Sequence, residues 1–400
     1  MPAVRVTPEI RFTGFTDDWE QRELGNVVEI VMGQSPDGST YSSMPSNYIL
    51  VQGNADLKNG WVEPRVWTTQ LTKKANKGDL IMSVRAPAGA MGKTAFDVVL
   101  GRGVAAIKGN DFIFTTLQKY DATGYWTKYS CGSTFDSLNS SQIESASINI
   151  PTISEQNKIG FVFHKLDDLI TLHQRKCDFL KEIKKTLLEK MFPANGESVP
   201  AIRFKGFTDD WEQRKFKALY SVIRNAFVGT ATPFYVDRGH FYLESNNVKN
   251  GHINHDSEIF INEEFYQRQK EKWLHTDDIV MVQSGHVGHT AVIPEELNNT
   301  AAHALIMVSS PKDHIEPYFV SYQMQSDSAK KNIDNITTGN TIKHILASDI
   351  KEFEITTTCI DEEIYISKLF RSIDKLITLH QRKCDMLKEM KHTLLVKMFV

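Results

Sequence analysis

The fold is decided by the stretch LDDLITLHQRKCDFLKEIKKTLLEKMF, residues 166–192, because it returns as IDKLITLHQRKCDMLKEMKHTLLVKMF at residues 373–399. The two copies agree at 21 of 27 positions and stand 207 residues apart. A second stretch, RFTGFTDDWEQR at 11–22, returns as RFKGFTDDWEQR at 203–214 with 11 of 12 positions identical. Both units are far longer than a solenoid repeat of roughly 20–50 residues. The chain is therefore expected to have an internal pseudo-twofold repeat.

The matched segment at the end of each unit is typical of a long helix. Apolar residues recur at steps of three and four, which is the period of a coiled coil. A helix with one apolar stripe is unstable alone, so the two copies are expected to pack on each other. The expected packing residues are Leu166, Leu169, His173, Cys177, Leu180 and Ile183 in the first copy, and Ile373, Leu376, His380, Cys384, Leu387 and Met390 in the second.

A histidine and a cysteine interrupt the apolar stripe of each helix. Single polar residues in a coiled-coil seam set its register, which is the favoured interpretation of His173 and Cys177 and their copies. A metal site is the alternative, but one His and one Cys per helix, four residues apart, is poor spacing for zinc. No metal is predicted.

The centres of the two units, roughly 23–150 and 215–355, hardly match each other. Both mix short apolar runs, such as Tyr48–Val51 and Asp278–Val282, with turn signals such as Asn59-Gly60, so each is expected to be an α+β globule. The predicted boundaries are a first globular domain at 1–150, a long helix and linker at 151–202, a second globular domain at 203–355 and a second long helix at 356–400.

The composition is that of an ordinary globular protein. Of 400 residues, 41% are apolar and 24% are charged, and 46 Lys and Arg stand against 49 Asp and Glu. Any surface for nucleic acid must therefore be local. No apolar run is long enough to predict a membrane span. The four cysteines, at 131, 177, 359 and 384, form no CxxC pair, which argues against structural zinc or a disulfide framework and favours a cytoplasmic protein.

Signatures of catalysis are weak. Asp37 and Asp56, with Lys58, match a permissive nuclease pattern in which two carboxylates would hold Mg²⁺. The second unit has Asn247 in place of Asp56, so a turn is the favoured interpretation of this segment. A standalone Mg²⁺-dependent nuclease is kept as an alternative.

A local basic stretch is typical of a nucleic-acid surface. Residues 73–108 carry seven Lys and Arg against two Asp, a net charge of +5, interleaved with glycines that let the backbone approach phosphates. Arg and Lys read guanine edges in the major groove, while Asn and Gln read adenine. The candidate DNA-binding residues are Gln52, Asn54, Lys73, Lys74, Lys77, Arg85 and Lys93 in the first unit, and Arg238, Asn246, Asn247, Gln283, Ser284 and His286 in the second.

The chain resembles the specificity subunits of type I restriction-modification enzymes over nearly its whole length. The resemblance rests mainly on the twin helix signature Leu-Ile-Thr-Leu-His-Gln-Arg-Lys, at 169–176 and 376–383. Further elements are the paired Phe-x-Gly-Phe…Trp-Glu segments at 12–20 and 204–212, Gly-Gln-Ser-Pro at 33–36, and Ser-Gly-His-Val-Gly-His-Thr-Ala from Ser284.

This resemblance implies both a fold and a function. The expected fold class is α+β, with two α/β target-recognition domains separated by two long antiparallel helices. Each domain would read one half of a split site in double-stranded DNA. The helices would space the domains and dock two modification (methyltransferase) subunits, which restriction (motor-nuclease) subunits would join. The chain itself would be non-catalytic, with no cofactor. A scaffold that holds proteins without reading DNA is the second alternative.

Overall fold

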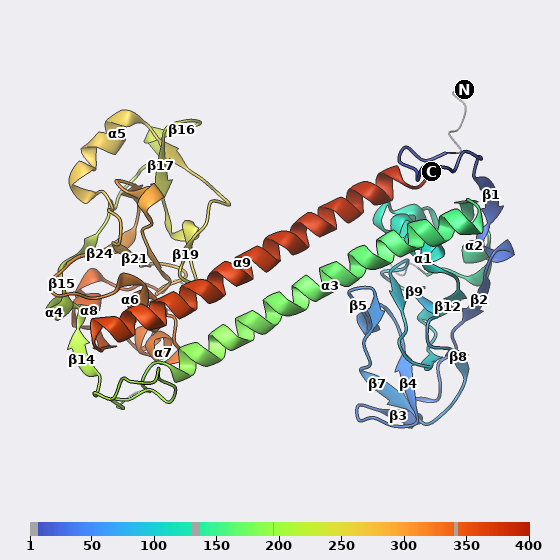
Figure 1. Ribbon diagram of the computed structural model, residues 1–400, viewed down its shortest axis with the longest axis horizontal. Coiled ribbons are helices and arrows are strands. Elements are labelled where there is room, and N and C mark those ends of the chain that lie inside the picture. Colours follow the sequence, from blue (N-terminus) through green and yellow to red (C-terminus); the bar gives the residue numbers. More distant parts are fainter. Residues whose placement is uncertain (1–6, 130–136, 195, 340–342) are drawn as a thin grey trace. The chain divides into compact units, whose positions relative to one another are not determined.

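The computed structural model describes residues 7–129, 137–194, 196–339 and 343–400 (Figure 1). Two compact units divide the chain: unit 1 comprises 1–175 with 380–400, and unit 2 comprises 176–379. The mixed α+β fold with two long helices is confirmed. Cys131 lies outside the described residues. None of the helices in the described ranges combines the length and the apolar character needed to span a bilayer.

Apart from the two-stranded sheet of β1 (Glu20–Glu23) and β13 (Ser147–Ile150), the described residues of unit 1 form two sheets. Its core lies between the larger sheet, α1 (Asp111–Ala122), α2 (Ser140–Glu144) and the long helices. The larger sheet has the strand order β2 (Glu29–Met32), β12 (Val104–Lys108), β9 (Leu80–Ser83), β10 (Met91–Lys93), β6 (Trp61–Val62) and β5 (Leu57–Lys58). The smaller has the order β3 (Tyr41–Ser42), β7 (Val66–Thr68), β4 (Tyr48–Val51), β11 (Val98–Leu100) and β8 (Lys73–Ala75).

Unit 2 repeats this topology although the sequences of the two centres hardly match. One sheet has the order β15 (Tyr220–Asn225), β24 (Leu305–Pro311), β21 (Ile279–Val282) and β22 (Thr290–Val292), which corresponds to β2-β12-β9-β10. The other has the order β16 (Tyr235–Val236), β20 (Phe260–Ile261), β17 (His240–Leu243) and β23 (Ala301–Ala302), which corresponds to β3-β7-β4-β11. The hairpin of β18 (Val248–Lys249) and β19 (His252–Ile253) corresponds to β5 and β6.

Short helices complete unit 2. They are α4 (Phe216–Leu219), α5 (Glu263–Arg268), α6 (Pro317–Gln323), α7 (Asp327–Ile336) and α8 (Ala347–Glu352). α6 and α7 follow each other closely but are separate helices. The N-cap of α7 is Ser326, whose hydroxyl accepts from the Ala329 N–H.

The repeated twelve-residue segment ties each domain to a long helix. Its end forms β1 (Glu20–Glu23), antiparallel to β13 (Ser147–Ile150), and the copy forms β14 (Glu212–Lys215), antiparallel to β25 (Glu354–Thr357). Its arginine makes a bidentate ion pair with a glutamate in the first turn of the helix. The pairs are Arg11 with Glu155, at 2.8 and 2.8 Å, and Arg203 with Glu362, at 2.7 and 2.8 Å. Both glutamates are fully buried, so losing either arginine would leave a buried charge unpaired.

The long helices are α3 (Ile153–Lys190) and α9 (Ile360–Lys397), and each contributes one half to either unit. They run antiparallel within each unit. In unit 1, the Nδ1 atoms of His173 and His380 lie 2.9 Å apart, and Lys391 Nζ lies 2.7 Å from Asp167. In unit 2, Cys177 Sγ donates to the Ile377 carbonyl at 4.0 Å, and Lys184 Nζ lies 2.7 Å from Asp374.

Part of the predicted helix seam is wrong. Leu169, Leu376 and Met390 are 42%, 43% and 45% exposed. The more buried positions follow 166, 170, 173, 177 and 180 in α3 and 373, 377, 380, 384 and 387 in α9. Each helix therefore carries two apolar stripes. Periodicity alone had merged them, because both have the same three-and-four spacing.

The two units differ where the long helix meets α1 in unit 1 and α6 in unit 2. In unit 1, the N-cap residue of α1, Asn110, donates from Nδ2 to Gln156 Oε1 at 2.9 Å. The residue equivalent to Gln156 in α9 is Glu363, whose carboxylate accepts the backbone N–H of Glu316, the N-cap residue of α6, at 3.0 Å. Burial, then the neighbouring carboxylates Glu316 and Glu362, raise the pKa of Glu363 to about 7.

The raised pKa of Glu363 predicts that the stability of the chain depends on pH. Because the pKa of Glu363 is raised from 4.5 to about 7 on folding, its ionisation destabilises the native state. The penalty is absent below pH 4.5, grows as pH rises through this window and is complete above pH 7. Glu363→Gln should raise the free energy of unfolding by about 2–3 kcal/mol at pH 8 and leave it unchanged near pH 4.5. Thermal unfolding at both pH values checks this.

The matched control is the reverse exchange in unit 1. Gln156→Glu should destabilise the chain at pH 8 more than at pH 4.5. An equal gain for Glu363→Gln at both pH values would contradict the account, because a packing effect would not titrate.

Candidate nucleic-acid interface

Each domain presents one hairpin turn with the same backbone frame. In unit 1 the turn joins β9 to β10: Gly89 N donates to the Ser83 carbonyl at 2.8 Å, and Gly89 has φ +110°. In unit 2 the turn joins β21 to β22: Gly288 N donates to the Val282 carbonyl at 3.0 Å, and Gly288 has φ +85°. A side chain at Gly89 would also meet Trp126 at 2.6 Å. Both glycines are therefore required by the turn.

Each turn forms a β-bridge with a later segment of its own unit, at an equivalent position. Arg85 forms an antiparallel bridge with Ser137, and Ser284 forms one with His344, which is 207 residues further along than Ser137. Three residues predicted independently as base readers, Arg85, Ser284 and His286, thus lie on equivalent turns. Arg85 and His286 are exposed, and Ser284 is partly exposed. Gln283 lies there too, with its carbonyl bound by Ile345 N at 3.0 Å.

A second pair of equivalent turns contains the other predicted readers. In unit 1, a buried Asp56 accepts the N–H groups of Gln52 at 2.7 Å and Gly53 at 3.2 Å. This leaves the Gln52 side chain exposed and Asn54 partly exposed. The turn interpretation of this segment therefore agrees with the structure. Lys58 pairs with Glu63 at 3.3 Å instead of facing Asp56.

The prediction of Asn247 as a DNA-binding residue is wrong. This residue takes the place of Asp56 in unit 2 and is 1% exposed. Its Oδ1 accepts the Glu244 N–H at 3.0 Å, and its Nδ2 donates to the carbonyls of Asn254 and Ser257 at 3.2 and 3.3 Å. Its amide is fully engaged in holding the turn and cannot read a base. The neighbouring Asn246 is exposed, as is Arg238 in the turn between β16 and β17.

The basic stretch of unit 1 divides into exposed and buried cations. Lys73 and Lys74 are exposed on β8, the edge strand of the smaller sheet, and Lys77 is exposed in the turn that follows. Lys93 is a correction: it is 8% exposed, forms an ion pair with Asp111 and lies over the Phe114 ring at 4.7 Å. Its stem packs in the core, so it is not part of a DNA-facing surface.

No group of three or more His, Cys, Asp and Glu side chains within the described ranges is placed to hold a metal ion. His173 and His380 face each other directly, but Cys384 instead donates toward the carbonyl of Ile170 at 3.9 Å and Cys177 toward that of Ile377. The interpretation of these histidines and cysteines as register-setting residues stays a prediction.

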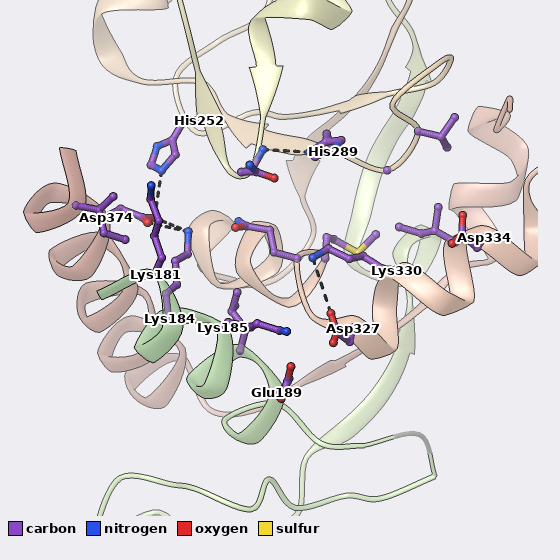
Figure 2. Close-up of a pocket in the computed structure, with 18 residues that line it drawn as sticks. Lys181, Lys184, Lys185, Glu189, His252, His289, Asp327, Lys330, Asp334 and Asp374 are labelled. Atoms are coloured by element: carbon purple, nitrogen blue, oxygen red, sulfur yellow. Dashed lines mark hydrogen bonds and ion pairs between the residues drawn. The ribbon is translucent and has the colours of Figure 1, made fainter. Parts of the chain in front are cut away.

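A pocket of about 630 Å³ lies beside the β21–β22 turn of unit 2 (Figure 2). Val287, Gly288 and His289 form one wall, and the last turns of α3 and helix α7 form others. Four lysines line it: Lys181, Lys184, Lys185 and Lys330. Sequence reasoning missed them, because lysines on a helix are usually a solvated face. The signal that could have found them is the lysine-rich end of α3, read together with the adjacent turn.

The family model for the type I restriction modification DNA specificity domain matches this chain twice, at residues 16–182 and 208–389. From Methanocaldococcus jannaschii, the provisionally named type I restriction enzyme MjaX specificity subunit is 31% identical over 184 residues, which is 43% of this chain and 42% of that protein. The MjaVIII specificity subunit of the same organism is 18% identical over 94% of this chain and 90% of that protein.

A solved structure has the same fold along the whole chain. The S subunit of a type I restriction-modification system from M. genitalium superposes with a TM-score of 0.72 at 12% identity, over 98% of this chain and 99% of that one. Because the family model matches both repeats over most of the chain, this protein belongs to the family of type I restriction-modification DNA specificity proteins.

Proposed function

We propose that this chain is the specificity subunit of a type I restriction-modification complex, and that each domain reads one half of a bipartite site in double-stranded DNA. The observation that carries the proposal is the pair of equivalent turns, 84–90 and 283–289. They share backbone hydrogen bonds and a left-handed glycine, yet their exposed residues differ. A fixed frame with variable side chains is what two recognition loops for two different half-sites require.

Within this proposal, the exposed polar residues divide by role. Lys73, Lys74 and Lys77 contact phosphates, because mobile ammonium groups on an edge strand neutralise charge without reading sequence. Base edges are read from the turns, by Arg85 with Gln52 and Asn54 in the first domain, and by Gln283, Ser284 and His286 with Arg238 and Asn246 in the second.

The second apolar stripes of the two long helices dock two modification subunits, one on each unit. Restriction subunits join that assembly. In unit 1, Leu169 and Leu172 are 42% and 45% exposed, and their equivalents in unit 2, Leu376 and Leu379, are 43% and 46% exposed. Met386 in unit 1 and its equivalent Phe179 in unit 2 are also exposed. One apolar pattern on each unit suits one partner of the same kind on each.

The chain itself is proposed to be non-catalytic and to act in the cytoplasm, where its DNA lies. The nuclease alternative loses support because Asp56 is occupied by backbone N–H groups, and because Asn247 replaces it in unit 2. Cleavage of a duplex by the purified chain with Mg²⁺ would favour that alternative instead. The scaffold alternative predicts that no substitution in the turns alters sequence preference.

Replacing the lysines should affect DNA affinity in general, whereas replacing Arg85 should affect sequence preference. Lys73→Ala, Lys74→Ala and Lys77→Ala together should weaken binding to all duplexes and reduce the salt slope by roughly one for each phosphate that is no longer neutralised. Arg85→Ala should relax preference at one base pair and cost about 1–3 kcal/mol on the cognate duplex. Titrations of cognate and scrambled duplexes at two salt concentrations check both. If the triple variant binds as the parent does, β8 does not face DNA.

The exposed stripe should control assembly with the modification subunits. Leu172→Glu should remove one modification subunit from the complex, and Leu172→Glu with Leu379→Glu should remove both. Each change removes about 1.5–3 kcal/mol of apolar burial. Native mass spectrometry counts the subunits. Ile153→Glu is the control, because Ile153 is 64% exposed on the same helix but about 100° away from the stripe. Full assembly of the double variant would rule out this surface.

A further inference from the structure

We propose that the pocket beside the β21–β22 turn receives a backbone phosphate of the DNA duplex, with its sugar against the apolar floor, so that the end of α3 takes part in DNA binding. This rests on the proposed function and adds to it a site that lies outside the two sheets. The buried side chains of Leu188, Met324 and Ile333 give the pocket an apolar lining, called its floor below. The four lysines belong to the same lining (Figure 2).

Two of the four acidic residues that line the pocket, Asp374 and Asp334, have other partners, whereas Glu189 and Asp327 add negative charge to it. Asp374 lies 2.7 Å from Lys184 Nζ and 3.3 Å from His252 Nε2, and it accepts the Tyr322 hydroxyl at 2.8 Å. Asp334 lies 2.6 Å from Lys343. Their negative charge is therefore neutralised before any ligand arrives.

The lysines, in contrast, are available. Lys181, Lys185 and Lys330 are exposed. Among the ion pairs of the described residues, neither Lys181 nor Lys185 has a partner, and Lys330 makes only a long contact of 4.0 Å with Asp327. Exposed pairs of that length contribute little and exchange readily. Set against Glu189 and Asp327, the three ammonium groups leave one net positive charge beside an apolar lining, which suits one singly charged sugar-phosphate unit.

His289 lies near several groups that carry positive charge. Burial lowers its pKa, and the charges of His286, Lys330 and Lys249 lower it further, as expected where the potential is positive. Its Nδ1 accepts the Asn250 N–H at 3.1 Å, so in the neutral ring the proton is on Nε2. The ring thus has a donor left for a phosphate oxygen.

The location links this site to base reading. Val287, Gly288 and His289 line the pocket, and Ser284 and His286 belong to the same seven-residue turn. A phosphate held in the pocket would fix the position of the duplex relative to that turn, since phosphate contacts set register and base contacts set sequence.

The test compares neighbouring lysines on one helix. Lys330 lines the pocket, whereas Lys331, also exposed on α7, does not. In the full chain assembled with its modification subunits, Lys181→Ala, Lys185→Ala and Lys330→Ala together should lower the salt slope of duplex binding by roughly one or more and leave the ratio of cognate to scrambled affinity unchanged. Lys331→Ala should keep the slope of the parent.

Lys330→Ala alone should show a smaller drop, and Lys330→Arg should restore the parent slope, which separates a charge effect from misfolding. The inference is overturned if the triple variant keeps the parent slope, or if Lys331→Ala lowers it equally, because the effect would then be a general field. A parent complex that binds no duplex at any salt concentration overturns the proposed function as well, so the two failures are distinguishable.

Discussion

The rest of the structure depends on one phenylalanine at the end of each long helix. Phe399, just beyond α9, lies 5.3 Å from Phe112, 6.2 Å from Trp19 and 5.6 Å from Phe163, measured between ring centroids. Phe192, just beyond α3, makes the same cluster in unit 2: it lies 5.4 Å from Phe319, 6.1 Å from Trp211 and 6.1 Å from Phe370. Each domain core is thus completed by the helix that ends the other repeat.

This exchange explains which parts of the sequence had to stay alike. Trp19 and Trp211 come from the repeated twelve-residue segment, and the two phenylalanines come from the repeated helix segment. Truncating one of these tryptophans or phenylalanines to alanine would leave a cavity in an aromatic core. Such a change typically costs about 3–5 kcal/mol of stability. The exposed residues of the hairpin turns carry no such constraint. They can diverge while the frame that holds them is preserved.

Much of the fold could be predicted from the repeats, because near-identity at a fixed offset of 207 residues is a strong signal. The presence of two long helices, α3 and α9, follows from the same signal. The shared topology of the two centres could not be predicted, since strands of two to seven residues with different side chains leave no common sequence pattern. The sequence also predicted the wrong residue for the helix seam, Leu169 instead of Ile170. Two apolar stripes with the same period can be told apart only by what packs against each of them.

The candidate site was predictable only in part. Arg85 and Ser284 were chosen from residue type, and their equivalence became visible only through the matching strand bridges. Asn247 and Lys93 were chosen in the same way, yet one holds a turn and the other packs over Phe114. Residue type indicates what a side chain could bind, and burial decides whether it is available. The pocket lysines of α3 were missed because their significance depends on a turn about a hundred residues further along the chain.

The most direct test of two independent recognition domains on one repeated frame is an exchange of residues 23–150 for the corresponding segment of a relative with a different target. The exchanged chain would be produced in cells with its modification subunits, and the methylated bases in the genome would be mapped. The account predicts that one half-site changes, while the other half-site and the gap between them stay the same. A change in both half-sites, or methylation that is unaltered by the exchange, would contradict it.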